Sequence, residues 1–342
     1  MSFDPGERRT LGATGLAVTR LAFGGASIGG LFRPVADDEA NRVMRHAWDL
    51  GIRTFDTAPL YGYGASERRV GWALADRPRD EFVLSTKVGR LVYAAADLPA
   101  GADIDRQAIA GREDAFYHRS EPVRLVFDYS HDGVLRSIEA SLTRFGLERI
   151  DVALIHDPDQ HWEAAIDGAY PALDQLRREG VVRAIGAGMN QSAMLSRFVR
   201  ETDIDVVLLA NRYTLLDQEA IVELLPACLQ RNVAVLIGGV MNSGILVDPS
   251  PTGRFDYVPA PPEIVARAQR LAAVCDRHKV ALKAAAIQFP LAHPAVASLV
   301  AGVRSVEHLD EYPRAMAMNL PGELWADLRG EGLIHPDAPV PT

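Results

Sequence analysis

Strand-like and helix-like segments alternate along the whole chain, and this alternation restricts the fold more than any other feature of the sequence. Short apolar runs are each followed by a longer segment with helical periodicity, which is typical of a parallel sheet covered by crossover helices. The predicted strands lie at residues 21–25, 53–56, 82–87, 151–156, 181–185, 205–211, 233–237 and 298–301. Eight strand–helix pairs without an internal linker predict an α/β protein with a (β/α)8 TIM barrel, formed by residues 1–342 as one domain.

Helical periodicity fills most of the chain between the predicted strands. The predicted helices lie at residues 37–50, 66–75, 129–145, 162–179, from 192 onward, 218–231, 263–279, 281–289, 306–318 and 321–329. Ser66 is available to cap the second of these helices. Residues 9–18 predict a small β-hairpin before the first barrel strand, with its turn between Gly12 and Gly15.

The alternation stops between residues 89 and 124, where Tyr93, Tyr117 and His118 lie among mixed charges. A long irregular insertion in a compact domain is either functional or disordered. Two interpretations therefore stay open, a loop over the barrel mouth and a mobile surface loop.

Composition narrows the class of partner and the compartment. The net charge is −9 without a basic cluster, which argues against nucleic acid and against an anionic membrane surface. No apolar run approaches a membrane span, and the polar first ten residues do not look like a secretory signal. Two cysteines, Cys228 and Cys275, indicate a reduced, cytoplasmic compartment, and no Cys/His spacing predicts a metal site.

Three predicted strands end on a polar side chain: Asp56, Lys87 and His156. Tyr61 lies on the loop that follows Asp56. Alone, such an aspartate is more often a helix cap, and such a tyrosine more often packs in a core. Because the carboxyl ends of barrel strands open on one face, we expect these four side chains to meet there.

The four side chains can together move a proton. A phenol has an ordinary pKa near ~10, so Tyr61 needs a neighbour that favours its phenolate. The ammonium of Lys87 would do so, the carboxylate of Asp56 would pair with Lys87, and His156 would donate a hydrogen bond to a substrate oxygen.

The motifs FDTAPLYGYGASE, STKVG and LIHDPD resemble those of the aldo-keto reductase superfamily, over about residues 9 to 314. The resemblance implies that Asp56, Tyr61, Lys87 and His156 form the catalytic tetrad. It implies that Tyr61 is the general acid or base while a hydride passes to or from C4 of a nicotinamide, with NAD or NADP as the cofactor. It also implies that the N-terminal hairpin plugs one end of the barrel.

The resemblance further implies a cofactor site built from later loops. Its predicted residues are Asn190, Asn211, Gly239, Gly302, Arg304 and His308. From the residues alone, Asn190 is equally a helix cap and Asn211 equally a turn residue. Many relatives place an aromatic residue after the seventh strand and an arginine at the position of His308. This chain has Ile237-Gly238-Gly239 at the first place, without a ring, so the stacking of the cofactor must differ. The histidine at the second place binds a phosphate less strongly than an arginine, so NAD is credible, while Arg304 keeps NADP open.

Within the superfamily, the segments LFRPV, IGGVMNSGIL and VAGVRSVEHL resemble the D-threo-aldose 1-dehydrogenase branch. This implies oxidation of the anomeric carbon of an aldose such as L-fucose, D-arabinose or L-galactose to the lactone, with Phe32, Tyr63 and Trp162 near the substrate. The alternatives are a pyridoxal 4-dehydrogenase, a general aldehyde or ketone reductase, a non-catalytic nicotinamide-sensing subunit, and a phosphate-substrate isomerase on the same fold. A homo-oligomer is a possible assembly.

Overall fold

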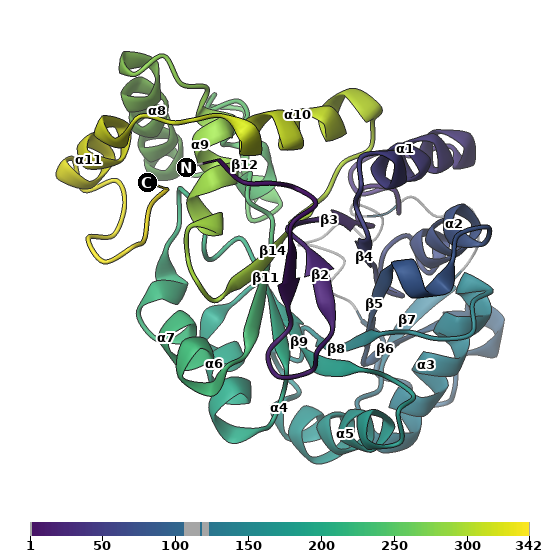
Figure 1. Ribbon diagram of the computed structural model, residues 1–342. Helices are drawn as coiled ribbons and strands as arrows, with labels where there is room; N and C mark the ends of the chain where they lie inside the picture. The colour runs from purple at the N-terminus through teal and green to yellow at the C-terminus, as the bar shows by residue number, and fades with distance from the viewer. Residues whose placement is uncertain (1, 106–116, 118–122, 342) are drawn as a thin grey trace. The chain divides into compact units, whose positions relative to one another are not determined.

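The computed structural model describes residues 2–105, 117 and 123–341, and its central feature is a closed barrel of parallel strands (Figure 1). Hydrogen-bonded neighbours in the barrel follow the order β10, β11, β14, β3, β4, β5, β8, β9. The predicted (β/α)8 fold is therefore confirmed.

The chain divides into two compact units, which are described in turn. The N-proximal unit consists of Ala22–Gly188 and Gly302–Leu309, and the C-proximal unit consists of Met1–Leu21, Met189–Ala301 and Asp310–Thr342. The prediction of a single domain stays a prediction.

The N-proximal unit follows the predicted alternation of strands and helices. Its elements are β3 (Leu21–Gly24), α1 (Asp37–Asp49), β4 (Thr54–Asp56), α2 (Ala65–Leu74), η1 (Arg79–Glu81), β5 (Val83–Val88), β6 (Arg90–Ala94), η2 (Ala95–Asp97), β7 (Val123–Phe127), α3 (His131–Phe145), β8 (Val152–His156), α4 (Trp162–Ala164), the π-helical turn η3 (Ala165–Ala169), α5 (Tyr170–Arg178) and β9 (Ala184–Met189). Strand β4 pairs in parallel with β3 and β5, and β8 pairs with β5 and β9. This register brings the carboxyl ends of β4, β5 and β8 together.

A buried carboxylate holds α2 in place within this unit. Glu67 is fully buried, and its two oxygens accept hydrogen bonds from Thr86 Oγ1 on β5, at 2.7 Å, and from the guanidinium of Arg144 on α3. A buried charge needs such partners because water no longer solvates it. The expectation that Ser66 caps α2 was wrong. Ser66 lies inside the helix, and its hydroxyl donates to the carbonyl of Gly25 at 2.8 Å.

Two predictions for this unit were wrong in part. The insertion contains an antiparallel hairpin, β6 with β7, in which Arg90 faces Phe127; its strands are too far apart in sequence for a hairpin signal. Of the residues singled out in the insertion, Tyr93 lies on β6, Tyr117 forms a bridge with Leu31, and His118 lies outside the described residues. Strand β9 begins three residues later than predicted. It also includes Gly186 and Gly188, which lie beyond the predicted end of the strand, because pairing with β8 keeps them extended.

The C-proximal unit contains the N-terminal hairpin and the later barrel strands. Its elements are β1 (Arg8–Thr10), β2 (Ala17–Thr19), α6 (Ser192–Glu201), β10 (Val206–Ala210), η4 (Glu219–Ile221), α7 (Leu224–Arg231), β11 (Ala234–Gly238), η5 (Asn242–Gly244), β12 (Arg254–Phe255), β13 (Val258–Pro259), α8 (Pro262–Arg277), α9 (Leu282–Leu291), β14 (Val296–Ala301) and α11 (Gly322–Gly330). Helix α10 (Val306–Ala317) precedes α11.

The predicted hairpin at residues 9–18 is confirmed as β1 paired antiparallel with β2. It is fastened to β14: Ser298 Oγ donates to the carbonyl of Thr19 at 2.7 Å, and the amide of Leu299 donates to the carbonyl of Arg20 at 2.9 Å. The buried guanidinium of Arg20 donates to the carbonyls of Val296 and Leu291. The hairpin therefore lies beside the amino-terminal half of a barrel strand.

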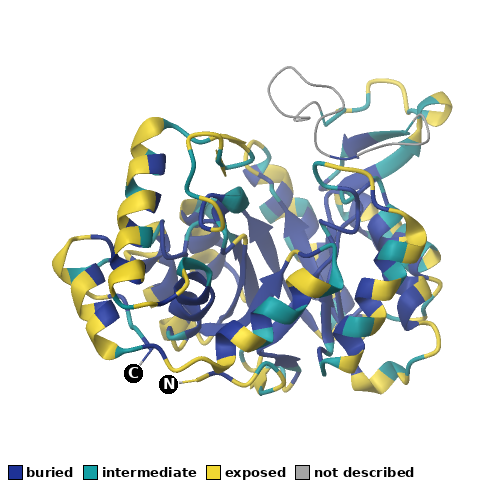
Figure 2. Cartoon of the chain, turned by 90° about the horizontal axis from the view of Figure 1, so that it is seen from above, coloured by how far each residue is buried: buried dark blue, intermediate teal, exposed yellow. Residues whose placement is uncertain are grey.

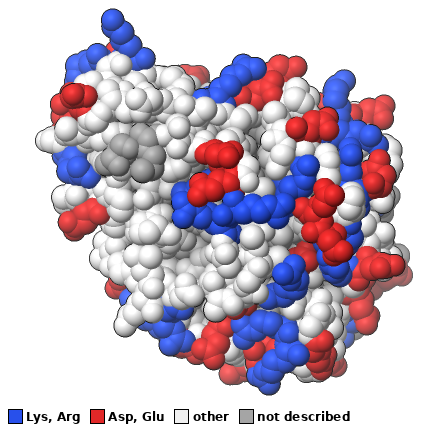
Figure 3. Space-filling view, in the orientation of Figure 1, with Lys and Arg blue, Asp and Glu red and all other residues white. Residues whose placement is uncertain are grey.

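The strands of the barrel and the helices around it differ in how far they are buried. The barrel strands are buried, and most of the helices around them, such as α1 and α8, have one buried and one exposed face (Figure 2), whereas α9 is buried along most of its length. On the face drawn in Figure 3, acidic and basic side chains lie next to one another, in keeping with exposed ion pairs such as Arg277 with Glu331. Among the helices that the structure describes, none is both long enough and apolar enough to cross a membrane.

Gly71 on α2 tests the packing of α2 against α3. A methyl group there would lie 1.9 Å from the carbonyl oxygen of Phe145, whereas one at Gly330, on α11, would meet nothing within 4 Å. Alanine is favoured over glycine inside a helix by about 1 kcal/mol, but overpacking typically costs about 1–3 kcal/mol. We therefore expect Gly71→Ala to lower the urea midpoint and Gly330→Ala to leave it unchanged or raise it. A Gly71→Ala protein as stable as the parent would contradict this packing.

Candidate active site

Asp56 and Lys87 form a buried ion pair at the ends of two neighbouring strands. Lys87 Nζ donates to Asp56 Oδ2 at 2.7 Å and to the carbonyl of Thr57 at 3.0 Å. Ser85 Oγ donates to the other carboxylate oxygen of Asp56 at 2.9 Å. Both charged side chains are at most 3% exposed. Each charge thus has partners that replace water, which a buried pair requires.

Tyr61 lies on the turn after β4 and faces this pair. Lys87 Nζ is 4.8 Å from the centre of the Tyr61 ring. The ring is edge-on to the imidazole of His156, with centroids 5.9 Å apart, and is 6.0 Å from the ring of Tyr117. The four side chains predicted as a tetrad therefore lie together in the N-proximal unit, and the alternatives of a helix cap and a core tyrosine do not describe them.

The backbone of His156 is fixed by two contacts, and its imidazole is neutral. The hydroxyl of Tyr129 donates to its carbonyl at 2.6 Å, and β9 pairs with it through Gly188. Burial lowers the pKa of His156 well below its usual value, and the cations of Arg90 and Lys87 lower it further. Asp157 Oδ2 lies 3.5 Å from Nε2, and Nδ1 is buried without a hydrogen-bond partner among the described residues. A neutral imidazole has one N–H donor and one acceptor nitrogen.

Sequence reasoning did not identify Arg90, which organises the residues behind His156. Its guanidinium is buried, donates to Asp157 Oδ2 at 3.2 Å, and lies 3.2 Å from Asp105 Oδ2. It also lies 5.2 Å from the ring centre of Phe127 on the paired strand β7. Arg90 thus joins the β6–β7 hairpin to Asp157, the residue that follows His156 at the end of β8. The available signal was an arginine three residues after Lys87, but its partners are far away in the sequence.

Two predicted cofactor residues, Asn190 and Asn211, contact each other in the C-proximal unit. Asn211 Nδ2 donates to Asn190 Oδ1 at 3.2 Å, and Asn211 has a positive φ of 65°. A side chain at Gly239 would lie 2.3 Å from Asn211 Oδ1, so only glycine fits there. Asn211 Oδ1 is buried and accepts no hydrogen bond from the residues that the structure describes. An unpaired amide oxygen beside a second amide fits the carboxamide of a nicotinamide.

The other predicted cofactor residues, Gly302, Arg304 and His308, lie in the N-proximal unit. Ser305 caps α10, because its hydroxyl accepts from the amide of His308 at 3.3 Å. Arg304 is partly buried, and burial lowers its pKa. A helix N-terminus next to an arginine fits a phosphate group.

For the three aromatic residues predicted to face the substrate, the structure gives the backbone conformation and the burial. Phe32 and Tyr63 both have positive φ angles, of 65° and 55°, and Trp162 is buried at the start of α4. Their role toward substrate stays a prediction. Among the described residues, no group of three or more His, Cys, Asp or Glu side chains could hold a metal ion.

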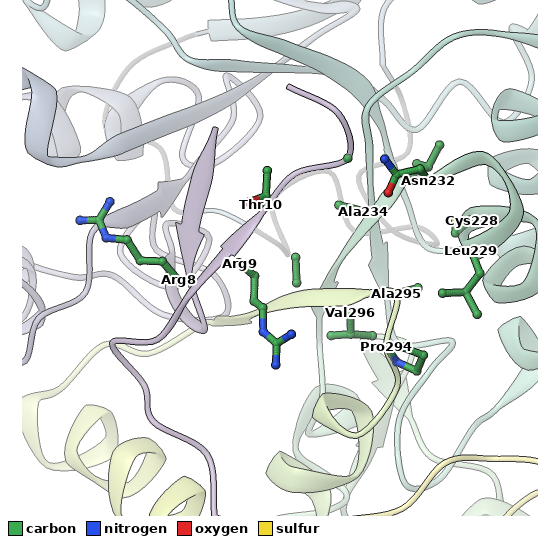
Figure 4. A pocket seen from close by; sticks show the side chains of 13 residues that line it. Arg8, Arg9, Thr10, Cys228, Leu229, Asn232, Ala234, Pro294, Ala295 and Val296 are labelled. Carbon is green, nitrogen blue, oxygen red and sulfur yellow. The ribbon is translucent and has the colours of Figure 1, made fainter. Parts of the chain in front are cut away.

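A cavity of about 370 Å³ lies elsewhere, in the C-proximal unit (Figure 4). It is lined by the N-terminal hairpin and by the residues that begin β11 and β14, such as Ala234 and Val296. Asn211 and Gly239 follow the opposite ends of β10 and β11. The cavity contains none of the predicted site residues and is a feature of the amino-terminal ends of the strands.

The fold is that of an α/β-barrel enzyme, and sequence comparison gives its family. The profile of the Aldo/keto reductase family matches residues 20–330. A D-threo-aldose 1-dehydrogenase of Pseudomonas sp is 44% identical over 326 residues, covering 94% of this chain and 96% of the relative. A pyridoxal 4-dehydrogenase of Microbacterium luteolum is 42% identical over 345 residues, covering 98% and 100%.

The solved structure of an aldo-keto reductase from Bacillus halodurans, in its holo form, superposes with a TM-score of 0.72 at 24% identity, covering 96% of each chain. That likeness concerns the fold. On the sequence evidence, the chain belongs to the aldo/keto reductase family and is an oxidoreductase. Enzymes of this family use NAD(P)H.

The depressed pKa of His156 predicts a pH dependence of stability. Below the unfolded pKa of about 6.5 the unfolded chain binds a proton that the folded protein does not, so stability falls with falling pH. Replacing this group by His156→Gln should make the fall in stability between pH 7 and pH 5 less steep, measured by urea unfolding at the two pH values.

His131 provides the control, because the hydrogen bonds that its ring donates to Gln175 Oε1 and Asp132 Oδ1 raise its pKa. A raised pKa contributes stability at low pH that is lost as the pH rises, so His131→Gln should steepen the dependence instead of flattening it. The same pH dependence in His156→Gln and the parent would show that His156 is not held neutral by burial.

Proposed function

We propose that this protein oxidises the anomeric carbon of an aldose to the lactone, with NAD as the preferred hydride acceptor. The observation that supports this most is the assembled set of Asp56, Lys87, Tyr61 and His156. The similarity to a D-threo-aldose 1-dehydrogenase over 94% of the chain supports the substrate class. The cyclic hemiacetal of an aldose has the hydroxyl proton and the C1 hydrogen that such an oxidation removes.

In this proposal Tyr61 removes the hydroxyl proton. The ammonium of Lys87 stabilises the phenolate that accepts it, and Asp56 fixes the position of that ammonium through the 2.7 Å hydrogen bond. The Thr57 carbonyl accepts a hydrogen bond from a second N–H of Lys87, so the direction of the ammonium group is fixed.

His156 orients the substrate oxygen. A neutral imidazole can donate a hydrogen bond from its N–H to this oxygen, which holds the oxygen near Tyr61. Its position is fixed by the Tyr129 hydroxyl, whose pKa burial raises, so that Tyr129 stays a donor.

The cofactor, when bound, supplies the hydride acceptor at C4 of its nicotinamide. Asn190, Asn211 and Gly239 would hold the carboxamide, and Gly302 and Arg304 would hold phosphate. Glu307, in the first turn of α10, has a lowered pKa because its carboxylate is hydrogen-bonded to backbone and to Ser305. A negative charge there disfavours the additional phosphate of NADP.

A second candidate function, the oxidation of pyridoxal, is favoured by the 42% identity to a pyridoxal 4-dehydrogenase over the full length of that relative. Pyridoxal can also close to a cyclic hemiacetal, so the same proton and hydride are removed. The two functions differ in the substrate that is turned over, which a direct comparison settles.

The test measures NADH formation with L-fucose, D-arabinose, L-galactose and pyridoxal. We expect the highest kcat/KM with one of the aldoses. Tyr61→Phe should lower kcat by ~10²–10⁴-fold at unchanged NAD affinity, because it removes the hydroxyl and keeps the ring. Tyr170→Phe, on α5, is the matched control and should keep full activity.

Turnover of pyridoxal alone would favour the second function, and activity of Tyr61→Phe within a few-fold of the parent would refute the role of Tyr61. Nicotinamide binding without any turnover would favour a sensing subunit instead.

Cofactor choice provides a separate prediction. His308 is exposed and supplies less to a phosphate than an arginine does, and Glu307 lies beside it. We expect NAD to be used at least as well as NADP, and His308→Arg to shift the preference toward NADP by roughly 1–3 kcal/mol in kcat/KM. His131→Arg adds the same charge on α3 and should change nothing. A parent enzyme that prefers NADP by about a hundredfold, or about 2.7 kcal/mol, would show that Arg304 alone suffices.

A further inference from the structure

The segment after β11 contains a small hairpin with an unusual turn. Strands β12 and β13 pair Phe255 with Val258, which leaves Asp256 and Tyr257 as a two-residue turn. Both residues have positive φ, of 47° and 67°, which is the geometry of a type I′ turn. Glycine or asparagine normally occupies the second of these positions, and a bulky tyrosine there is strained. Such strain persists where the surroundings enforce it, and often marks a functional site.

Specific contacts enforce this turn. Arg212, the residue after Asn211, binds both carboxylate oxygens of Asp256, at 2.8 and 2.6 Å. The amide of Tyr257 donates to Ser243 Oγ at 2.9 Å. A bidentate arginine–carboxylate pair fixes direction as well as distance. The turn is thereby fastened to the segment that follows β10.

The side chain of Tyr257 reaches both asparagines of the candidate carboxamide site. Its hydroxyl donates to Asn190 Oδ1 at 3.3 Å and accepts from Asn211 Nδ2 at 3.4 Å. The same two amides are joined by the 3.2 Å hydrogen bond between them. Each of the three polar groups is therefore hydrogen-bonded to the other two. Asn211 Oδ1 is the acceptor among them that has no partner in the described residues.

We propose that Tyr257 is a positioning residue of the nicotinamide site, whose hydroxyl fixes the amides of Asn190 and Asn211 for the cofactor's carboxamide. The inference rests on the proposed function, which assigns those two asparagines to the carboxamide. Many relatives have an aromatic residue directly after this strand, β11, and this chain does not. Here the segment that follows β11 provides an aromatic residue further along, Tyr257. The strained turn and the Arg212–Asp256 pair are the means by which the tyrosine is held.

The test compares binding of NADH with binding of ADP-ribose, which lacks the nicotinamide, by isothermal titration calorimetry. Tyr257→Phe removes only the hydroxyl and should weaken NADH binding by about 2- to 10-fold, as expected for the loss of one neutral hydrogen-bonding group. Tyr257→Ala, which removes the ring as well, should weaken it further. Affinity for ADP-ribose should stay within twofold of the parent in both variants.

Val258→Thr is the matched control, since Val258 lies next to Tyr257 on the same hairpin and is exposed; it should bind NADH like the parent. Unchanged NADH affinity in both tyrosine variants would overturn the inference. So would tighter binding by Tyr257→Ala, which would mean that the tyrosine obstructs the site, or an equal loss for ADP-ribose, which would mean a general structural role. A parent protein that binds neither NADH nor NADPH would overturn the proposed function itself.

Discussion

The buried ion pair between Lys87 and Asp56 is the interaction on which the candidate active site depends. Neither charge could stay in the barrel interior alone, because an unpaired buried charge costs several kcal/mol. The parallel register of β4 with β5 places the two side chains within hydrogen-bonding distance, and Ser85 and Thr57 occupy their remaining hydrogen-bonding positions. The pair in turn fixes a cation 4.8 Å from the centre of the Tyr61 ring, and a cation at close range favours the charged form of a phenol.

A second charge cluster, Arg90 with Asp157 and Asp105, lies next to His156. Because Arg90 is on β6, this cluster links the β6–β7 hairpin to the residue that follows His156. Burial and the two cations, Arg90 and Lys87, keep the imidazole neutral, while the Tyr129 hydroxyl holds its backbone. The site therefore combines the phenol of Tyr61 with the neutral imidazole of His156, which has one hydrogen-bond donor and one acceptor nitrogen.

The sequence predicted the barrel and the tetrad because both depend on short-range patterns. Apolar runs predicted the strands, and Asp56, Lys87 and His156 stand at the ends of such runs, where a parallel barrel brings side chains together. Arg90 and Tyr257 were not predicted because their partners lie tens of residues away and are set by tertiary packing. The two glycines of β9 were assigned to a loop because glycine has no side chain to indicate a strand, although β8 pairs with them. The roles of the individual site residues remain predictions until they are tested.

The central claim is that the hydrogen on the hemiacetal carbon leaves as a hydride to the nicotinamide while the hydroxyl proton leaves through Tyr61. The most direct measurement uses an aldose deuterated at C1 and determines, by mass spectrometry, where the deuterium is found after turnover. The account predicts one deuterium in the reduced cofactor, none in the lactone, and a primary isotope effect on kcat/KM under conditions where hydride transfer limits the rate. Deuterium that is retained in the sugar product, or that exchanges into water, would contradict it.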